Sequence, residues 1–346
     1  MKNNIEADIQ EVYRLLTKKE NIFFKEKKVL LLGSDGFLGK YFKQYFNYLI
    51  NKKIKVYVDC VDNHISSKVE HKDLMVNKNF IKHYNMDILK FNKKKKYDLI
   101  IFLAGIASPT IYKKFPIESL EVSYLGTKKF LEKSKLEKSL FIYFSSSEVY
   151  GNPDIQNIPT NETYYGNVNP FGPRSCYDEG KRVGETLCYI YKNYFKTKIK
   201  IIRPFNVFGP AMSKNDDRVI PRFVRALKKK KFLRVYNRGD QTRSFTYIID
   251  ALHGFLKVII KGKEGEIYNV GNDMEEISIF NLAKFISKNV VNNTAIKIKK
   301  MTYPSYYPGN EPMRRQPDLK KIRNDTGFYP SIDLKSGLKK FIKYYQ

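Results

Sequence analysis

Tyr177 and Lys181 stand four residues apart in the segment Ser175–Thr186, and this pair is the feature of the sequence best suited to chemistry. On a helix, residues at this spacing share one face, so a phenol and an ammonium group would lie side by side. A tyrosine in water has a pKa of about 10, and a fixed positive charge beside it stabilises the phenolate. The pair predicts proton removal from an alcohol. Because the chain has 26 tyrosines, the spacing alone is also compatible with a helix carrying a solvated lysine.

A second polar group follows the apolar segment Leu140–Phe144, which predicts a buried strand. Ser145, Ser146 and Ser147 come directly after it, and Glu148 follows them. In doubly wound sheets, ligands bind at the carboxyl ends of the strands. We therefore expect these hydroxyls and this carboxyl group to lie in one crevice.

Three glycines lie between a predicted strand and a predicted helix near the start of the chain. They are Gly33, Gly36 and Gly39, with Phe37 and Leu38 between the last two. Glycines here allow a tight turn, close approach of the backbone to a phosphate, and close packing of the helix on the strand. The spacing is Gly-x-x-Gly-x-x-Gly, which differs from the usual dinucleotide fingerprint, but its position predicts a pyrophosphate site.

Asp62, in Val61–Asn63, is the acidic residue expected after the second strand, 23 residues beyond Gly39. A carboxylate there would accept hydrogen bonds from a ribose 2′-hydroxyl and repel a 2′-phosphate, so it favours NAD over NADP. The alternatives are that Asp62 and Asn63 form a simple turn, and that nearby Lys68 admits NADP.

Strand and helix patterns alternate over the first half of the chain, which predicts a Rossmann-type α/β fold: a doubly wound parallel sheet with a smaller C-terminal substrate-binding domain. We expect an amphipathic helical extension at 1–26, an NAD-binding domain at 27–202 with a return segment near 243–276, and a mainly substrate-binding domain at 203–346. The expected elements are strands at Lys28–Gly33, Lys55–Val58, Leu99–Leu103 and Leu140–Phe144, a helix ending near Leu49 and a helix at Ile117–Lys135.

The amino-acid composition indicates which classes of protein this chain can belong to. The 346 residues carry a net charge of +29 and are 42% hydrophobic, which fits a globular chain. The lysine runs lack the interleaved aromatics of a base-stacking surface, so we expect no nucleic-acid partner. Without a signal peptide or an apolar run of membrane length, the prediction is a cytoplasmic protein with no membrane span. Three scattered cysteines and four histidines predict no metal site.

The motifs occur in an order that resembles the extended short-chain dehydrogenases/reductases acting on nucleotide sugars. More narrowly, five blocks resemble the UDP-glucuronate decarboxylases, and the similarity runs from about Lys28 to the C-terminus. The blocks are Gly172–Val183, Phe205–Pro210, Asn215–Val219, Gln241–Phe245 and Arg314–Asp318.

The resemblance implies a bound NAD and a specific chemistry. It makes Tyr177 the catalytic base, Lys181 its electrostatic partner and Ser146 the hydroxyl that binds the 4-oxygen of the sugar. Oxidation at C4 of UDP-glucuronate would give a ketone β to the carboxylate, so CO2 can leave. Protonation at C5 and reduction at C4 would then yield UDP-xylose.

Two further residues separate decarboxylases from their relatives in this interpretation. Related 4,6-dehydratases place an Asp-Glu pair where this chain has Ser147 and Glu148, and serine has no pKa suited to acid catalysis. Arg315 suits the substrate carboxylate, and it is chosen over Arg314 only by its distance from Pro317. The alternative for Glu148 and Arg315 is a structural ion pair.

The resemblance also assigns the remaining contacts and a homodimer built from helices near 110–135 and 177–193. The expected substrate contacts are Asn206, Arg218, Val219, Tyr236, Gln241 and Arg243, and the remaining cofactor contacts are Asn63, Asp87, Leu103 and Ala104. The chain departs from the family pattern at Asp35, Ser123, Ala211 and Asn237–Arg238. A nucleotide-sugar 4-epimerase, a 4,6-dehydratase and a non-catalytic cationic binding protein therefore stay open as alternatives.

Replacing Tyr177, the proposed catalytic base, tests the role of the Tyr177–Lys181 pair. Tyr177→Phe should retain substrate and NAD binding and lose on the order of a hundredfold or more in turnover, because the general base is removed. Steady-state rates and binding titrations measure both effects. Tyr48→Phe, which alters another tyrosine four residues before a lysine, is the matched control. Near-normal turnover of Tyr177→Phe would exclude this tyrosine from the mechanism.

Overall fold

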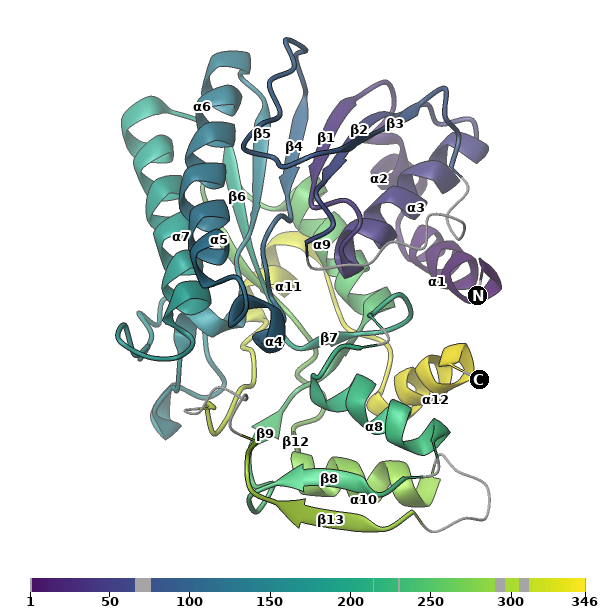
Figure 1. The fold of residues 1–346 in the computed structure, drawn as a ribbon. Coiled ribbons are helices and arrows are strands. Elements are labelled where there is room, and N and C mark those ends of the chain that lie inside the picture. The colour runs from purple at the N-terminus through teal and green to yellow at the C-terminus, as the bar shows by residue number, and fades with distance from the viewer. Residues whose placement is uncertain are drawn as a thin grey trace.

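A seven-stranded sheet, parallel throughout, forms the centre of the protein (Figure 1). The computed structural model describes residues 2–65, 76–213, 215–229, 231–289, 296–304 and 311–345. The strand order is β11-β6-β5-β4-β1-β2-β3, which confirms the predicted Rossmann-type class. The strands are β1 (Lys28–Leu32), β2 (Tyr57–Asp62), β3 (Ile81–Asn85), β4 (Leu99–Phe102), β5 (Leu140–Phe144), β6 (Ile199–Pro204) and β11 (Ile267–Val270).

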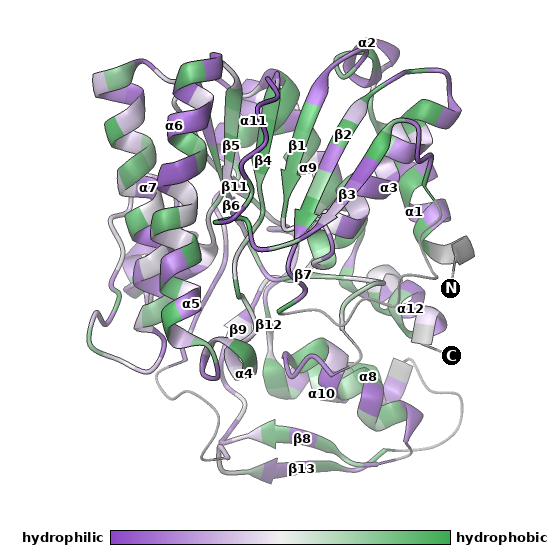
Figure 2. Ribbon diagram, turned by 45° about the horizontal axis from the view of Figure 1, so that its top comes forward, coloured by the Kyte–Doolittle hydropathy of each residue, from purple (hydrophilic) through white to green (hydrophobic). Residues whose placement is uncertain are grey.

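Except for the edge strand β3, the strands are mostly buried because helices cover both faces of the sheet (Figure 2). In β1, Val29 and Leu31 face one core, whereas Leu30 and Leu32 face the other. The first core contains α3 (Phe37–Asn51) and α9 (Ile248–Lys261). The second lies under α6 (Thr127–Glu137) and α7 (Ser175–Phe195).

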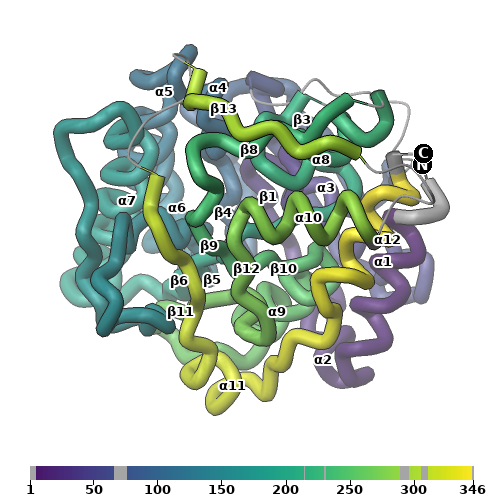
Figure 3. The backbone as a smooth tube through the Cα atoms, turned by 90° about the horizontal axis from the view of Figure 1, so that it is seen from below, coloured from purple at the N-terminus to yellow at the C-terminus, as the bar shows by residue number. Residues whose placement is uncertain are grey.

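The N-terminal extension is helical and packs on the first face of the sheet. It comprises α1 (Lys2–Leu15) and α2 (Lys18–Ile22), and its apolar stripe of Ile5, Ile9, Val12 and Leu16 is buried in the first core. The predicted amphipathic helix is therefore present. α1 also lies beside α12 (Leu334–Tyr345) (Figure 3). There Lys340 Nζ of α12 contacts Glu11 Oε2 of α1 at 2.9 Å.

A smaller lobe lies beyond the carboxyl ends of the strands, at the bottom of Figure 1. It is built from short two-stranded sheets and helices that converge on one side of a cavity. Its elements are β7 (Val207–Phe208) with β10 (Thr246–Tyr247), β9 (Thr242–Arg243) with β12 (Ile277–Ser278), β8 (Leu233–Tyr236) with β13 (Ile298–Met301), and the helices α8 (Val219–Lys228), α10 (Ile279–Asn289) and α12. α11 (Lys320–Thr326) returns to pack on α9 and β11.

One predicted element boundary was wrong. The second strand was expected at Lys55–Val58 but runs over Tyr57–Asp62, since Tyr57 is the residue that pairs with Lys28 of β1. The helical segment expected at Ile117–Lys135 is present over residues 116–137, where α5 (Pro116–Glu121), a π-helical turn η2 (Val122–Gly126) and α6 follow one another. A π turn has no composition signal that could have revealed it.

Other expectations concern features that the described residues do not contain. Lys68 lies outside the described residues. No described helix is both long and apolar enough to cross a membrane. In the described part of the chain, no group of three or more His, Cys, Asp or Glu residues is placed to bind a metal ion.

Candidate functional site

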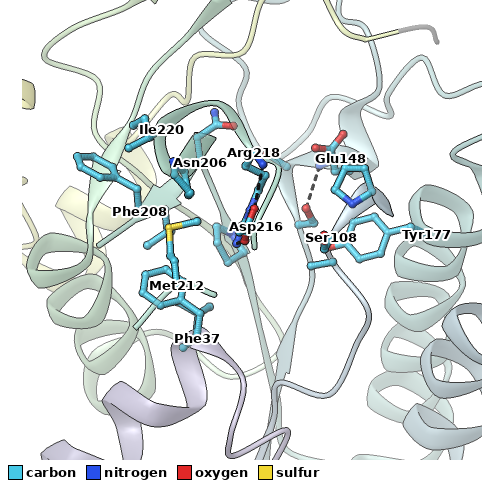
Figure 4. Close-up of a pocket in the computed structure, with 18 of the residues that line it drawn as sticks. Phe37, Ser108, Glu148, Tyr177, Asn206, Phe208, Met212, Asp216, Arg218 and Ile220 are labelled. Carbon is cyan, nitrogen blue, oxygen red and sulfur yellow. Dashed lines mark hydrogen bonds and ion pairs between the residues drawn. The ribbon is translucent and has the colours of Figure 1, made fainter. Parts of the chain in front are cut away.

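A cavity of about 370 Å³ separates the carboxyl ends of the sheet from the smaller lobe (Figure 4). The sheet half contributes the glycine loop, the serines after β5 and the first turns of α7. The other half contributes the segments around β7, α8 and β9. This is the crevice in which open α/β sheets bind ligands.

The glycine loop is shaped by contacts that exclude side chains at two positions. A Cβ on Gly33, whose φ is +81°, would lie 2.8 Å from the backbone of Ala104, and one on Gly39 would lie 2.2 Å from Gly33 O. A Cβ on Gly36 would meet only Gly33 O, at 3.5 Å, and otherwise face open space beside the cavity. Gly36 caps α3, so the loop offers free amide groups at a helix N-terminus, which fits a pyrophosphate.

Asp62 ends β2 beside this loop. Its carboxylate accepts hydrogen bonds from the backbone N–H groups of Asp35 at 2.9 Å and of His64 at 2.8 Å. Each carboxylate oxygen has a second lone pair, so a ribose hydroxyl can still donate to it. Asn63 donates to Asp87 at 3.5 Å in the same corner.

Asp35 adds a second carboxylate to the phosphate loop, where the family pattern has a small apolar residue. It binds the buried ammonium group of Lys43 and the His64 ring, the latter at 2.9 Å. Burial opposes ionisation of Asp35, but Lys43 and His64 outweigh it and lower the pKa of this carboxyl group. The added charge is therefore neutralised within the protein.

The Tyr177–Lys181 pair lies on the cavity wall at the start of α7, as the spacing predicts. The Tyr177 hydroxyl hydrogen-bonds the side chain of Ser146, and its ring stacks on Tyr112 of α4 (Pro109–Tyr112) at 5.7 Å. Lys181 Nζ donates to Phe144 O at 2.8 Å and lies 5.9 Å from the centre of the Tyr177 ring.

The protonation of this pair differs from the sequence-based expectation. Burial raises the pKa of Tyr177 to about 12, although the bond from Ser146 opposes this. Burial also lowers the pKa of Lys181 to about 8. Burial therefore outweighs any lowering of the Tyr177 pKa by Lys181, whose ammonium group donates to the Phe144 carbonyl. A positively charged nicotinamide ring beside the phenol would supply further stabilisation of the phenolate.

Glu148 is the centre of a buried ionic cluster. It lies in the short 3-10 helix η3 (Ser147–Tyr150). Arg315 donates two hydrogen bonds, of 2.7 and 2.6 Å, to its carboxylate. Arg174 donates to the same carboxylate from the start of α7. Burial favours the neutral acid, but the two guanidinium groups outweigh it and hold the pKa of Glu148 well below its usual range. The ion pair anticipated as an alternative is thus present, and it faces the cavity.

Arg315 and its neighbour Arg314 have different environments. Arg315 is 5% exposed and lines the cavity. Arg314 instead pairs with Glu276 at 2.6 Å and is not among the lining residues. The geometry therefore supports the choice of Arg315, for which the sequence offered only a distance from a proline.

The part of the cavity lined by the smaller lobe contains the residues expected to bind the nucleotide. Arg243 pairs with Glu311 at 2.9 Å, Gln241 donates to the Tyr303 hydroxyl at 3.0 Å, and Arg218 pairs with Asp216 (Figure 4). Asn206, Val219 and Tyr236 line the same region. Arginine forks and a tyrosine wall fit a diphosphate and a base.

The structure brings most of the predicted residues together. Asp62, Asn63, Asp87 and Ala104 lie beside the glycine loop, but they are not among the residues that line the cavity. Sequence reasoning missed Arg174, Tyr112, Tyr303 and Glu311, which do line it. Only Arg174 carried a usable signal, since it stands three residues before Tyr177 in a block already singled out.

The fold and this site define a class of Rossmann-type enzyme that moves hydride at an alcohol. Residues 29–271 match the NAD dependent epimerase/dehydratase family. The chain belongs to this family and is an NAD-dependent enzyme of the extended short-chain dehydrogenase/reductase type.

Named relatives and solved structures agree with this class. UDP-glucuronic acid decarboxylase 1 of Xenopus tropicalis is 33% identical over 99% of this chain and 77% of its own length. UDP-glucuronic acid decarboxylase 6 of Arabidopsis thaliana is 32% identical over 93% and 89%. The structure of UDP-glucuronic acid 4-epimerase from Bacillus cereus, in complex with UDP-glucuronic acid and NAD, superposes with a TM-score of 0.77 at 26% identity, covering 92% of this chain and 98% of that one.

Cofactor choice provides a test of Asp62. Asp62→Asn keeps an acceptor oxygen for one of the two loop amides and removes the charge, so the ratio of NAD to NADP affinity should fall by on the order of tenfold. Titration of both cofactors, followed by protein fluorescence, measures this ratio. Asp98→Ala, at the opposite end of the sheet where Asp98 accepts from Lys28 N, should leave it unchanged. An unchanged ratio in Asp62→Asn would mean that this carboxylate does not face the ribose.

Proposed function

We propose that this protein is a nucleotide-sugar decarboxylase that converts UDP-glucuronate into UDP-xylose. The observation that carries the proposal is the buried Glu148–Arg315 pair, which stands beside Tyr177 at the reacting end of the cavity. It supplies a cation for the substrate carboxylate and a carboxyl group for proton transfer. Ser147 precedes it, where a 4,6-dehydratase would need an acid.

The first step is oxidation at C4, for which bound NAD supplies the hydride acceptor. Tyr177 removes the proton of the C4 hydroxyl, and Ser146, already bonded to Tyr177, orients the same oxygen. Lys181 stabilises the phenolate through its buried charge. All three lie against the cavity at the end of β5 and the start of α7.

The second step is loss of CO2 from the 4-ketone. Arg315 exchanges part of its bond with Glu148 for the substrate carboxylate, because a guanidinium fork binds either anion. Glu148 then loses a cationic partner, so its pKa rises and it can carry the proton that C5 requires. The carbon–carbon bond electrons form an enolate, C5 takes up one proton, and each turnover consumes one proton overall.

Nucleotide recognition rests on the arginines that the smaller lobe contributes to the cavity. Arg243 and Arg218 suit the diphosphate, and Tyr236 suits a face of the uracil ring. The chain's net charge of +29 also favours an anionic substrate. The epimerase from Bacillus cereus is a structural relative, so inversion at C4 without loss of CO2 is the competing outcome.

Separating oxidation from decarboxylation tests this function. Given saturating UDP-glucuronate, Glu148→Gln and Arg315→Ala should still reduce bound NAD, seen as NADH absorbance, while CO2 release falls by about a hundredfold. Arg314→Ala, whose side chain pairs with Glu276, is the matched control and should release CO2 normally. The function is excluded if the wild-type protein releases no CO2 and forms UDP-galacturonate or a 4-keto-6-deoxy sugar.

We also propose that the protein is a homodimer assembled through α5, η2 and α7. These elements pack against one another on one side of the sheet (Figure 1). They also expose apolar side chains. The exposed residues are Ile117, Leu120, Tyr124, Leu125, Tyr189, Ile190 and Tyr194. A second copy of the same surface would cover them about a two-fold axis.

Charge placed on this surface should separate the subunits. Leu125→Glu combined with Tyr189→Glu should convert the dimer into a monomer, because each interface would bury four carboxylates without partners. Light scattering after size-exclusion chromatography measures the mass. Tyr329→Glu, at an exposed tyrosine elsewhere, should remain dimeric. A wild-type protein that is monomeric at every concentration would contradict the proposal.

A further inference from the structure

A second cavity of about 210 Å³ lies behind the ionic cluster. Arg174 lines both cavities and so forms part of the wall between them. The second cavity is polar, and its lining includes Asn152, Asn167 and Asn169 from the loops after β5. The proposed mechanism does not use it.

Asp178 lines this second cavity but not the first. It lies one turn after Arg174 and is 5% exposed. Its Oδ2 accepts from Arg174 Nε at 3.3 Å. Among the described residues, Oδ1 has no hydrogen-bond partner, although it is buried. Burying an ionised carboxylate with an unsatisfied oxygen costs free energy, so we expect this oxygen to carry a proton or to bind a water molecule.

Arg174 connects Asp178 to the reacting end of the site. Its guanidinium group contacts Glu148 on the cavity side, Asp178 on the opposite side and Glu311 at 3.4 Å. Glu148 and Asp178 therefore compete for one cation. Two carboxylates that share a cation titrate as a coupled pair.

The coupling between Glu148 and Asp178 bears on the proton transfer that the proposed reaction requires. Two guanidinium groups keep Glu148 ionised, yet the reaction requires a proton at C5. Protonating Glu148 alone would leave Arg174 with less compensating charge. If Asp178 ionises as Glu148 is protonated, the charge of the cluster stays constant.

We propose that Asp178 is a positioning residue for Glu148 that acts through Arg174, holding the proton of the pair when Glu148 is ionised and releasing it when Glu148 is protonated. This inference rests on the proposed decarboxylase function. Glu148 takes its proton from solvent in the first cavity, while Asp178 releases one to solvent by way of the second. After Glu148 gives its proton to C5, Asp178 regains one by the same route, so the one proton consumed in each turnover enters through Glu148. Arg174 transfers no proton, because a guanidinium group is not deprotonated in proteins.

The groups around Asp178 support this assignment. Burial and the charge of Glu148 together raise the pKa of Asp178 to about 7, against the opposing charges of Arg174 and Arg315. The charge of Asp178 in turn acts on Tyr112 of α4 and on Cys176 and Tyr177 of α7.

Asp178→Asn tests the proposal because it keeps the shape and removes the proton. In the wild-type protein, UDP-xylose formation should fall as pH rises through about 7, as Asp178 loses its proton. In Asp178→Asn, the rate at neutral pH should fall by about tenfold or more and this pH dependence should disappear, while NADH formation stays within about twofold. Asp178→Glu should restore both rate and profile. Glu179→Gln, at the next residue, is the matched control.

A stability measurement tests the coupling without any assay of activity. Because the folded-state pKa of Asp178 lies above its unfolded value of 3.8, its contribution to stability is complete below that value and is lost as pH rises to about 7. Asp178→Asn should lack this loss in urea unfolding, and Glu148→Gln should reduce it, because the like charge is gone. Equal pH dependence in all three proteins would overturn the inference. If the wild-type protein releases no CO2, the proposed function fails, but the coupling is still tested here.

Discussion

One largely buried carboxylate, that of Glu148, whose side chain is 17% exposed, sets the geometry on which the site depends. A charge removed from water must be compensated, and here Arg174 and Arg315 provide the compensation. These arginines come from the start of α7 and from the segment before α11, whereas Glu148 follows β5. The ionic cluster therefore joins the sheet to the C-terminal part of the chain, and the cavity between the two halves takes its shape from that junction.

The same cluster prepares the site for an anionic ligand. Arg174, Arg243 and Arg315 are each held by a carboxylate of the protein, so their orientations are set before a ligand arrives. An incoming anion exchanges with these carboxylates and need not order free side chains, which reduces the entropic cost of binding. The exchange also changes the charge around Glu148, so ligand binding and proton affinity are linked.

Much of the fold could be predicted because its signals are local. Apolar strands, the glycine turn and the helical face shared by Tyr177 and Lys181 depend on neighbours within a few residues. The error at the start of β2 arose because the register with β1 decides where that strand begins. The π turn η2 was not foreseen because it lies within a segment that has an ordinary helical composition.

By itself the sequence determined the class of fold, the order of the motifs and the residue types that carry the chemistry, because periodicity and spacing act over short distances. Only the tertiary structure decided which charges meet. Glu311 has no local feature that sets it apart from other acidic residues, yet it contacts Arg174 across 137 residues of sequence. Lys181 has the expected spacing, yet the Phe144 carbonyl engages its charge. Burial and long-range contacts set these electrostatic properties, and neither can be read from neighbouring residues.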